Sequence, residues 1–148
     1  MSDFDGELAA MRIEIAAERE ALVAALGALG DHDLELVRRG SWAVRDVLRH
    51  VIDSEIAYAK VIAHLRGRTA DIGGGDVDLT SIEGALSGLA GTRSALLTAL
   101  DGVDEAAFYE LRAVGREQYS VLSVLENVAS HDREHLEQIA RLADGRQG

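Results

Sequence analysis

The chain of 148 residues contains no proline. Proline removes a backbone N–H donor and clashes with the preceding turn, and average usage would place about seven prolines in a chain of this length. Their absence permits long, uninterrupted helices. The 47% of apolar and 28% of charged residues are typical of a globular protein that can form a core. We therefore expect one helical domain over residues 1–148.

Apolar residues recur at helical spacing in four segments. These segments run from about Ser2 to Leu29, Ser41 to Arg66, Thr80 to Leu100 and Ser120 to Asp144. Ser41 is a good N-cap for the second, and Thr80–Glu83 fits a capping box for the third. Four such helices predict an all-α fold, a four-helix bundle.

Two stretches are less regular. Residues 101–119 predict a short helix over Asp104–Phe108 followed by irregular chain. In the third helix, Gly84, Gly88 and Gly91 lie along one line. The favoured interpretation of this line is a weak helix with a thin face, and the alternative is close approach of a neighbouring helix or a substrate.

Composition excludes several classes of protein. With no cysteine, the chain has no disulfide, cysteine nucleophile or thiolate zinc site, so any thiol chemistry must use a thiol brought by another molecule. The formal charge of −11 argues against nucleic-acid binding. The longest stretch without a charged residue, Ala21–Gly30, has ten residues, about half a membrane span. The acidic start, Met1–Asp5, lacks a signal sequence, so we expect a soluble, cytoplasmic protein with no membrane partner.

Histidines supply the candidate chemistry. His131 and His135 lie four residues apart, about 6 Å along the helix axis, on or beside the apolar stripe of the fourth helix. Buried imidazoles need partners, and a divalent metal is one. His50, at the edge of the second helix's stripe, could complete a three-nitrogen zinc site, or it could bond a backbone carbonyl at the bundle edge. His32 and His64 need no special explanation.

Carboxylates near these histidines have several possible roles. Asp46, one turn before His50, could accept its free ring N–H. Glu55 falls on the inner stripe and could be a general base, a fourth ligand or half of an internal ion pair. Asp132 and Glu134 are expected at a solvated or partner-facing edge. The segment from His131 to His135 is not the His-Glu-x-x-His pattern of metalloproteases.

Two segments resemble the signatures of the DinB-like (damage-inducible) family. Ser41–His50, read Ser-Trp-Ala-Val-Arg-Asp-Val-Leu-Arg-His and followed by Glu55, resembles the family's second helix. The segment Val124–Ile139, with His131 and His135, resembles its fourth. The order and spacing of the helices agree over nearly the whole chain.

This resemblance implies an up-down-down-up bundle, often a homodimer, with His50, His131 and His135 as metal ligands. It implies zinc, nickel or a similar divalent ion as the cofactor. Relatives in the family include transferases and isomerases that use a low-molecular-weight thiol, mycothiol or bacillithiol, as well as hydrolases. Three functions stay open: a metal-dependent enzyme, a non-catalytic metal- or ligand-binding stress-response protein, and a helical dimer without metal.

Further expectations concern single residues and the interface. Trp42 is expected to be a buried anchor that seats the second helix on the core, rather than part of a substrate pocket. Arg112, Arg116 and Arg133 are candidates to meet an anionic substrate. The first and third helices are the candidates for a dimer interface. The sequence does not identify the substrate, and Gly73–Gly75 lacks the residues of a phosphate-binding loop.

Overall fold

The computed structural model describes residues 3–69 and 77–144, and the statements below concern those residues. Four long helices lie within these ranges, α1 (Asp3–Gly27), α2 (Val44–Leu65), α3 (Ile82–Leu100) and α5 (Val121–Asp144). The connections hold the 3-10 helix η1 (Asp31–Glu35), the helix α4 (Glu105–Tyr109) and the strands β1 (Arg112–Val114) and β2 (Glu117–Tyr119). The predicted all-α bundle is confirmed. Gly73–Gly75, compared above with a phosphate-binding loop, lie outside the described residues.

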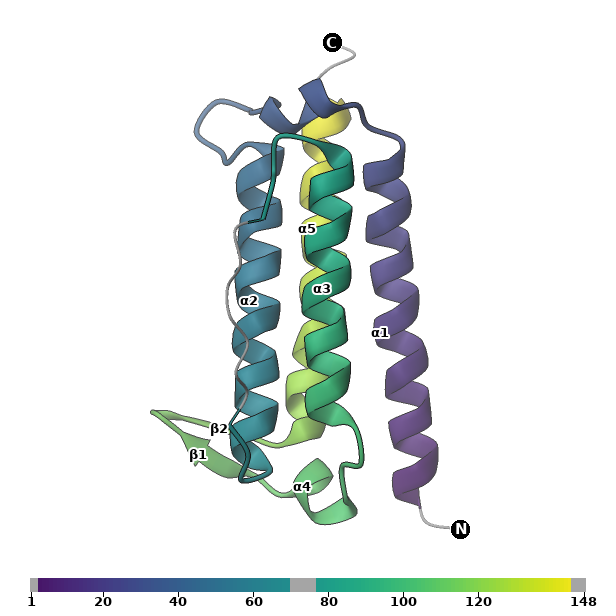
Figure 1. Ribbon diagram of the computed structural model, residues 1–148, viewed down its shortest axis with the longest axis vertical. Coiled ribbons are helices and arrows are strands. Elements are labelled where there is room, and N and C mark those ends of the chain that lie inside the picture. The colour runs from purple at the N-terminus through teal and green to yellow at the C-terminus, as the bar shows by residue number, and fades with distance from the viewer. Residues whose placement is uncertain (1–2, 70–76, 145–148) are drawn as a thin grey trace.

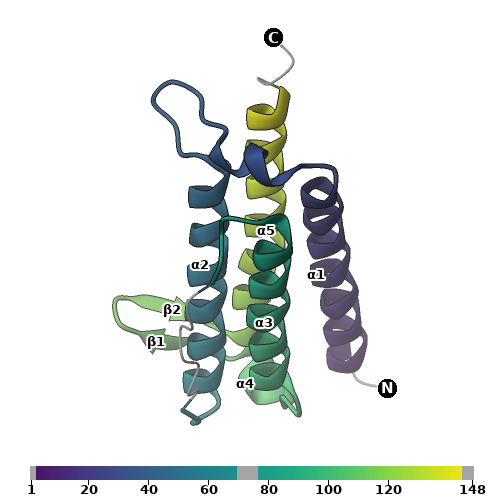
Figure 2. The ribbon, with the colours of Figure 1, turned by 45° about the horizontal axis from the view of Figure 1, so that its top comes forward.

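The long helices run up-down-down-up (Figure 1). α2 and α3 both begin at the end of the bundle where η1 lies, while α1 and α5 run the other way, as the turned view also shows (Figure 2). α2 packs along α3 and α5, and α5 packs along α1, whereas α1 and α3 touch at few points. In the described part of the chain, the seam between α1 and α3 is therefore open.

Helix α2 begins later than the sequence predicts. Ser41 Oγ accepts the Arg38 N–H and donates to the Arg38 carbonyl, which closes a turn before the helix. Ala43 occupies the N-cap position, and its N–H donates to Asp46 Oδ2 at 3.1 Å. The prediction of Ser41 as N-cap is wrong, and Asp46 caps the helix rather than orienting His50. The negative charge of Asp46 also interacts favourably with the positive, N-terminal end of the helix dipole.

The chain segment that precedes α3 lies close against the helix, and this explains two of its three glycines. A Cβ at Gly84 would lie 2.1 Å from the Asp78 carbonyl oxygen, and one at Gly88 would lie 2.5 Å from Val77 Cγ1. A Cβ at Gly91 would meet nothing within 4 Å. The favoured interpretation, a merely thin helix face, is therefore wrong for Gly84 and Gly88, which admit the chain segment that precedes α3.

A small hairpin follows α4, in the stretch predicted to be irregular. β1 and β2 pair antiparallel, with Arg112 opposite Tyr119 and Val114 opposite Glu117. Gly115 adopts φ +66°, which suits a two-residue hairpin loop because glycine has no Cβ to clash there. Strands of three residues are too short to show the alternation on which strand prediction depends.

The core consists of two apolar halves with a charged layer between them. One half, towards α4, contains Ile15, Phe108 and Leu125, and the other, towards η1, contains Leu26, Leu48 and Ile139. At the level between them each long helix contributes a buried polar side chain. These side chains are Arg19 of α1, Glu55 of α2, Thr92 of α3 and Asp132 of α5.

Candidate metal centre

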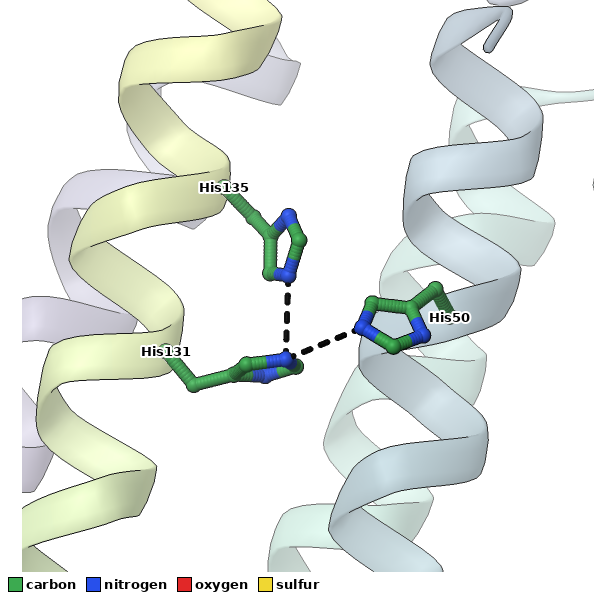
Figure 3. Close-up of side chains that lie close together, drawn as sticks. All are labelled: His50, His131 and His135. Atoms are coloured by element: carbon green, nitrogen blue, oxygen red, sulfur yellow. Dashed lines mark hydrogen bonds between the residues drawn. The ribbon is translucent and has the colours of Figure 1, made fainter.

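Three imidazole rings meet between α2 and α5 (Figure 3). His50 extends from α2, and His131 and His135 extend from successive turns of α5. The His131 Nε2 atom lies 3.1 Å from His50 Nε2 and 3.0 Å from His135 Nε2. Two nitrogens bound tetrahedrally to one zinc at about 2.05 Å are about 3.3 Å apart. The spacing of the rings therefore suits a single divalent ion.

The position of each histidine relative to the apolar stripes explains why they meet. On α2, Val47 and Val51 are buried, and His50 lies between them at the margin of the stripe, half-buried. On α5, Val128 is buried and the two histidines follow at the margin of its stripe, also half-buried. Because α2 and α5 pack side by side, the two margins face each other.

The hydrogen-bond chemistry of the three rings suits a bound cation. Gln138 Oε1 lies 2.8 Å from His135 Nδ1. An amide oxygen only accepts, so His135 carries its proton on Nδ1 and directs the Nε2 lone pair towards the other two rings. Only one hydrogen, on His131 Nε2, could then serve both neighbouring nitrogens. A divalent ion would accept all three lone pairs, so the residues fit a metal ligand set.

Burial and the neighbouring rings favour the neutral forms of His131 and His50. Burial and then the neighbouring His135 and His50 lower the pKa of His131 to about 4. Burial and then His135 lower the pKa of His50, opposed by Asp53. Neutral imidazole is the form that binds metals, so near neutral pH neither His131 nor His50 has to lose a net proton when an ion binds, although a hydrogen on His131 Nε2 would have to move to Nδ1.

Two aromatic rings border the triad. The Trp42 ring lies 5.3 Å from the His50 ring, and the Tyr58 ring lies 5.9 Å from the His131 ring, both edge-on. Trp42 is 48% exposed, so its prediction as a buried anchor is wrong. Burial first, and then the negative charge of neighbouring groups, raises the pKa of Tyr58. Its hydroxyl therefore stays protonated at neutral pH and can donate a hydrogen bond.

A second polar cluster, the ion cluster, occupies the charged layer of the core. It contains Arg19, Glu55, Thr92, Arg93 and Asp132. Arg19 donates to Glu55 Oε2 and to Asp132 Oδ2, both at 2.9 Å, and Arg93 reaches the same two atoms at 2.9 and 3.0 Å. Thr92 Oγ1 donates to Glu55 Oε1 at 2.6 Å. Two cations thus balance two anions and join all four long helices.

The ion cluster settles some predictions and corrects others. Glu55 is neither a metal ligand nor a free base, since its carboxylate is half of an internal ion pair. Asp132 is 2% exposed, so the prediction of a solvated or partner-facing edge is wrong for it, whereas Glu134 is exposed, as that prediction expects. Sequence reasoning missed Arg19 and Arg93, because charged residues on helices usually face solvent.

The three arginines suggested to bind an anionic substrate contact other protein groups or solvent. Arg133 pairs with Glu18 at 2.7 Å on the α1 side of the bundle. Arg112 donates to the Leu65 carbonyl and pairs with Glu110 near the hairpin. Arg116 is exposed at the hairpin loop. Arg133 and Arg112 are therefore already partnered, and the structure does not support the suggestion for them.

The chain belongs to the DinB superfamily. The sequence model of that superfamily matches residues 14–139, a range that includes the three histidines and the whole ion cluster. Comparison with curated proteins and with solved structures finds no match. Family membership and the three-histidine group are together compatible with metal binding. No bilayer-spanning candidate occurs among the described helices, because none unites the required length with the required apolarity.

Proposed function

We propose that the protein binds one divalent metal ion through the Nε2 atoms of His50, His131 and His135 and is a metal-dependent enzyme. The observation that carries the proposal is the convergence of these three nitrogens, with the His135 proton held on Nδ1 by Gln138. Imidazole ligands suit zinc and nickel, and three ligands leave a coordination position for water or substrate. Trp42 and Tyr58 would contact a molecule bound there.

Two reaction classes suit such a site, transfer to a low-molecular-weight thiol and hydrolysis. A divalent ion with an open position lowers the pKa of a bound water or thiol and so supplies a nucleophile at neutral pH. The chain has no cysteine, so the thiol must be a second substrate. Activity only in the presence of added thiol would support the transferase, and activity without thiol would support the hydrolase.

The second candidate function is a non-catalytic metal- or ligand-binding protein of a stress response. Its support is that the triad sits at the margin of the core, where an ion would also join α2 to α5. It predicts an increase in melting temperature with metal and no turnover with any thiol or ester substrate. Turnover that His135→Ala abolishes would exclude it.

The first experiment is the metal content of protein purified without a histidine tag. We expect about one divalent ion per chain by elemental mass spectrometry. Trp42 is the chain's single tryptophan and its ring lies 5.3 Å from His50, so it reports on the same site. Added Ni²⁺ should quench its fluorescence one-to-one, with Zn²⁺ competing. No metal as isolated and none taken up from Zn²⁺ or Ni²⁺ would refute the proposal.

We also propose that the partner of the protein is a second copy, bound along the open α1–α3 seam. A groove of about 730 Å³ follows this seam, and Val23 and Leu97 in its walls are 37% and 38% exposed. The residues that line the groove include a single carboxylate, Asp101, so two chains of charge −11 can meet there with little repulsion. Light scattering should give a dimer for the wild type and a monomer for Leu97→Glu. Ile13→Glu is the control, because Ile13 lies outside the groove, and this variant should remain a dimer.

A further inference from the structure

A small cavity adjoins the triad at the η1 end of the bundle. It measures about 170 Å³ and is lined by Arg38, Ser41, Gln138, Arg141 and Leu142. Gln138 belongs to both sites, because its Oε1 atom accepts the His135 Nδ1–H. Ser41 precedes Trp42, whose ring meets His50. The cavity is therefore next to the metal centre and is made by the same two segments of chain.

The walls of the cavity have the chemistry of an anion site. Neither Arg38 nor Arg141 forms an ion pair with any carboxylate in the described residues, whereas Arg133 and Arg45 do. Ser41 Oγ bonds both the N–H and the carbonyl of Arg38, so the backbone that carries one of the two arginines is held in a turn. In a chain of charge −11, which repels anions at long range, two arginines that line one cavity and have no carboxylate partner within residues 3–69 and 77–144 would be a local exception.

Dimensions restrict the ligand. A volume of 170 Å³ equals about five to six times the roughly 30 Å³ share of one water, enough for a carboxylate or a phosphate group. Gln138 and Arg141 follow His135 by three and six residues, or roughly 4.5 and 9 Å along the axis of α5. A ligand with one end at the three nitrogens would therefore have to span at least about 5–9 Å to place a group in the cavity.

We infer that the substrate carries an anionic end group, which Arg38 and Arg141 bind while its other end lies at the three-histidine centre. Arg38 and Arg141 are then specificity-determining residues, since guanidinium groups bind carboxylate and phosphate oxygens bidentately. This inference rests on the proposed metal binding and names the substrate class that the metal site by itself does not define.

The test uses cobalt-loaded protein, whose visible absorption reports ligands of the metal. Adipate has a carboxylate at each end, and hexanoate has the same length with only one. We expect adipate to bind at least about tenfold more tightly, as charge-assisted hydrogen bonds predict. The same preference should hold for 6-mercaptohexanoate over 6-mercaptohexanol. Arg141→Gln and Arg38→Gln should remove most of it.

Arg39→Gln is the matched control, because it removes the same charge from the neighbouring exposed residue, which does not line the cavity. It should leave the preference unchanged. Equal affinity of the wild type for adipate and hexanoate, with clear binding of both, would overturn the inference and leave the metal proposal intact. Failure to bind cobalt would overturn the metal proposal and the inference with it.

Discussion

The triad lies between α2 and α5, and the ion cluster lies among all four long helices. The two share neighbouring stretches of α2 and α5, yet they differ in how their polar groups are satisfied. In the ion cluster, two guanidinium groups meet two carboxylates, and no buried side-chain nitrogen or oxygen of the described residues lacks a partner. In the triad, three groups of one kind meet at 3.0–3.1 Å with one hydrogen to share. Asp132 and His131 are neighbours in sequence but belong to different clusters.

This difference separates a structural element from a candidate site. Complementary charges satisfy one another in the interior and need nothing from outside. Like groups that converge cannot satisfy one another fully, and the pKa values of His131 and His50 fall because burial and, after it, the neighbouring rings disfavour an added proton. Such an arrangement is stable when a cation supplies what the side chains lack.

The largest expected effect is loss of metal from the triad without loss of fold. His135→Ala should abolish stoichiometric metal, and His50→Ala should weaken binding by more than about 100-fold, since even an outer hydrogen-bond partner contributes 10–100-fold. Isothermal titration with Zn²⁺ measures this. His64→Ala, an exposed histidine on the same helix, should bind like the wild type. Full metal occupancy in His50→Ala would mean that the third ligand is another residue.

The next effect is loss of stability from the ion cluster with retention of the metal site. Arg19→Met leaves one guanidinium for two buried carboxylates and should lower the free energy of unfolding by about 3–5 kcal/mol. At saturating Zn²⁺ the variant should still bind one ion per chain. The control Arg133→Met breaks an exposed pair and should cost less than about 1 kcal/mol in urea denaturation. Equal losses in the two variants would contradict a structural role for the cluster.

A smaller effect is expected where the triad meets its outer partner. Gln138→Leu removes the acceptor of the His135 Nδ1–H but keeps similar volume, so the ring loses its fixed tautomer. Metal affinity should fall about 10- to 100-fold. The melting temperature of the metal-free protein should change little. Glu137→Leu is the control, because Glu137 is the exposed residue directly before Gln138 in α5. This variant should leave the metal affinity unchanged.

The smallest effect is a pH dependence of the metal-free protein. An unfolded histidine binds its proton near pH 6.5, whereas burial and the other two rings lower the pKa of His131 in the folded protein to about 4. Between these values the unfolded state binds more protons, so stability falls as the pH is lowered from 6.5 towards 4. Urea midpoints with a chelator should show a smaller fall in His131→Gln. Parallel curves would contradict the lowered pKa.

The order and class of the helices could be predicted from the sequence because both depend on local chemistry. The missing prolines and the apolar spacing predict four long helices, and all four are found. The residue that caps the start of a helix was less predictable, because several side chains can form the capping hydrogen bond. Ser41 and Asp46 both suit a cap, and only the path of the preceding turn decides that Asp46 serves α2.

Which candidate ligands lie together could also be predicted, in part, from the sequence. His131 and His135 share a face by helical spacing, and His50 lies at the edge of the second helix's stripe. The family resemblance grouped the three, and the structure brings them together. The orientation of Trp42 was not within reach, because an indole at a helix start can fold inward or lie on the surface, and the neighbouring elements decide which. Here it lies beside His50, 48% exposed.

The sequence by itself determined the four long helices and the shared face of His131 and His135, since periodicity along one helix is a local property. Only the tertiary structure decided which charges are buried together. Arg19 and Asp132 are 113 residues apart, and each resembles an ordinary surface residue of its own helix. They become an ion pair because α1 and α5 bring them to the same level of the core. That pairing depends on the register between helices, which arises from packing of the whole bundle.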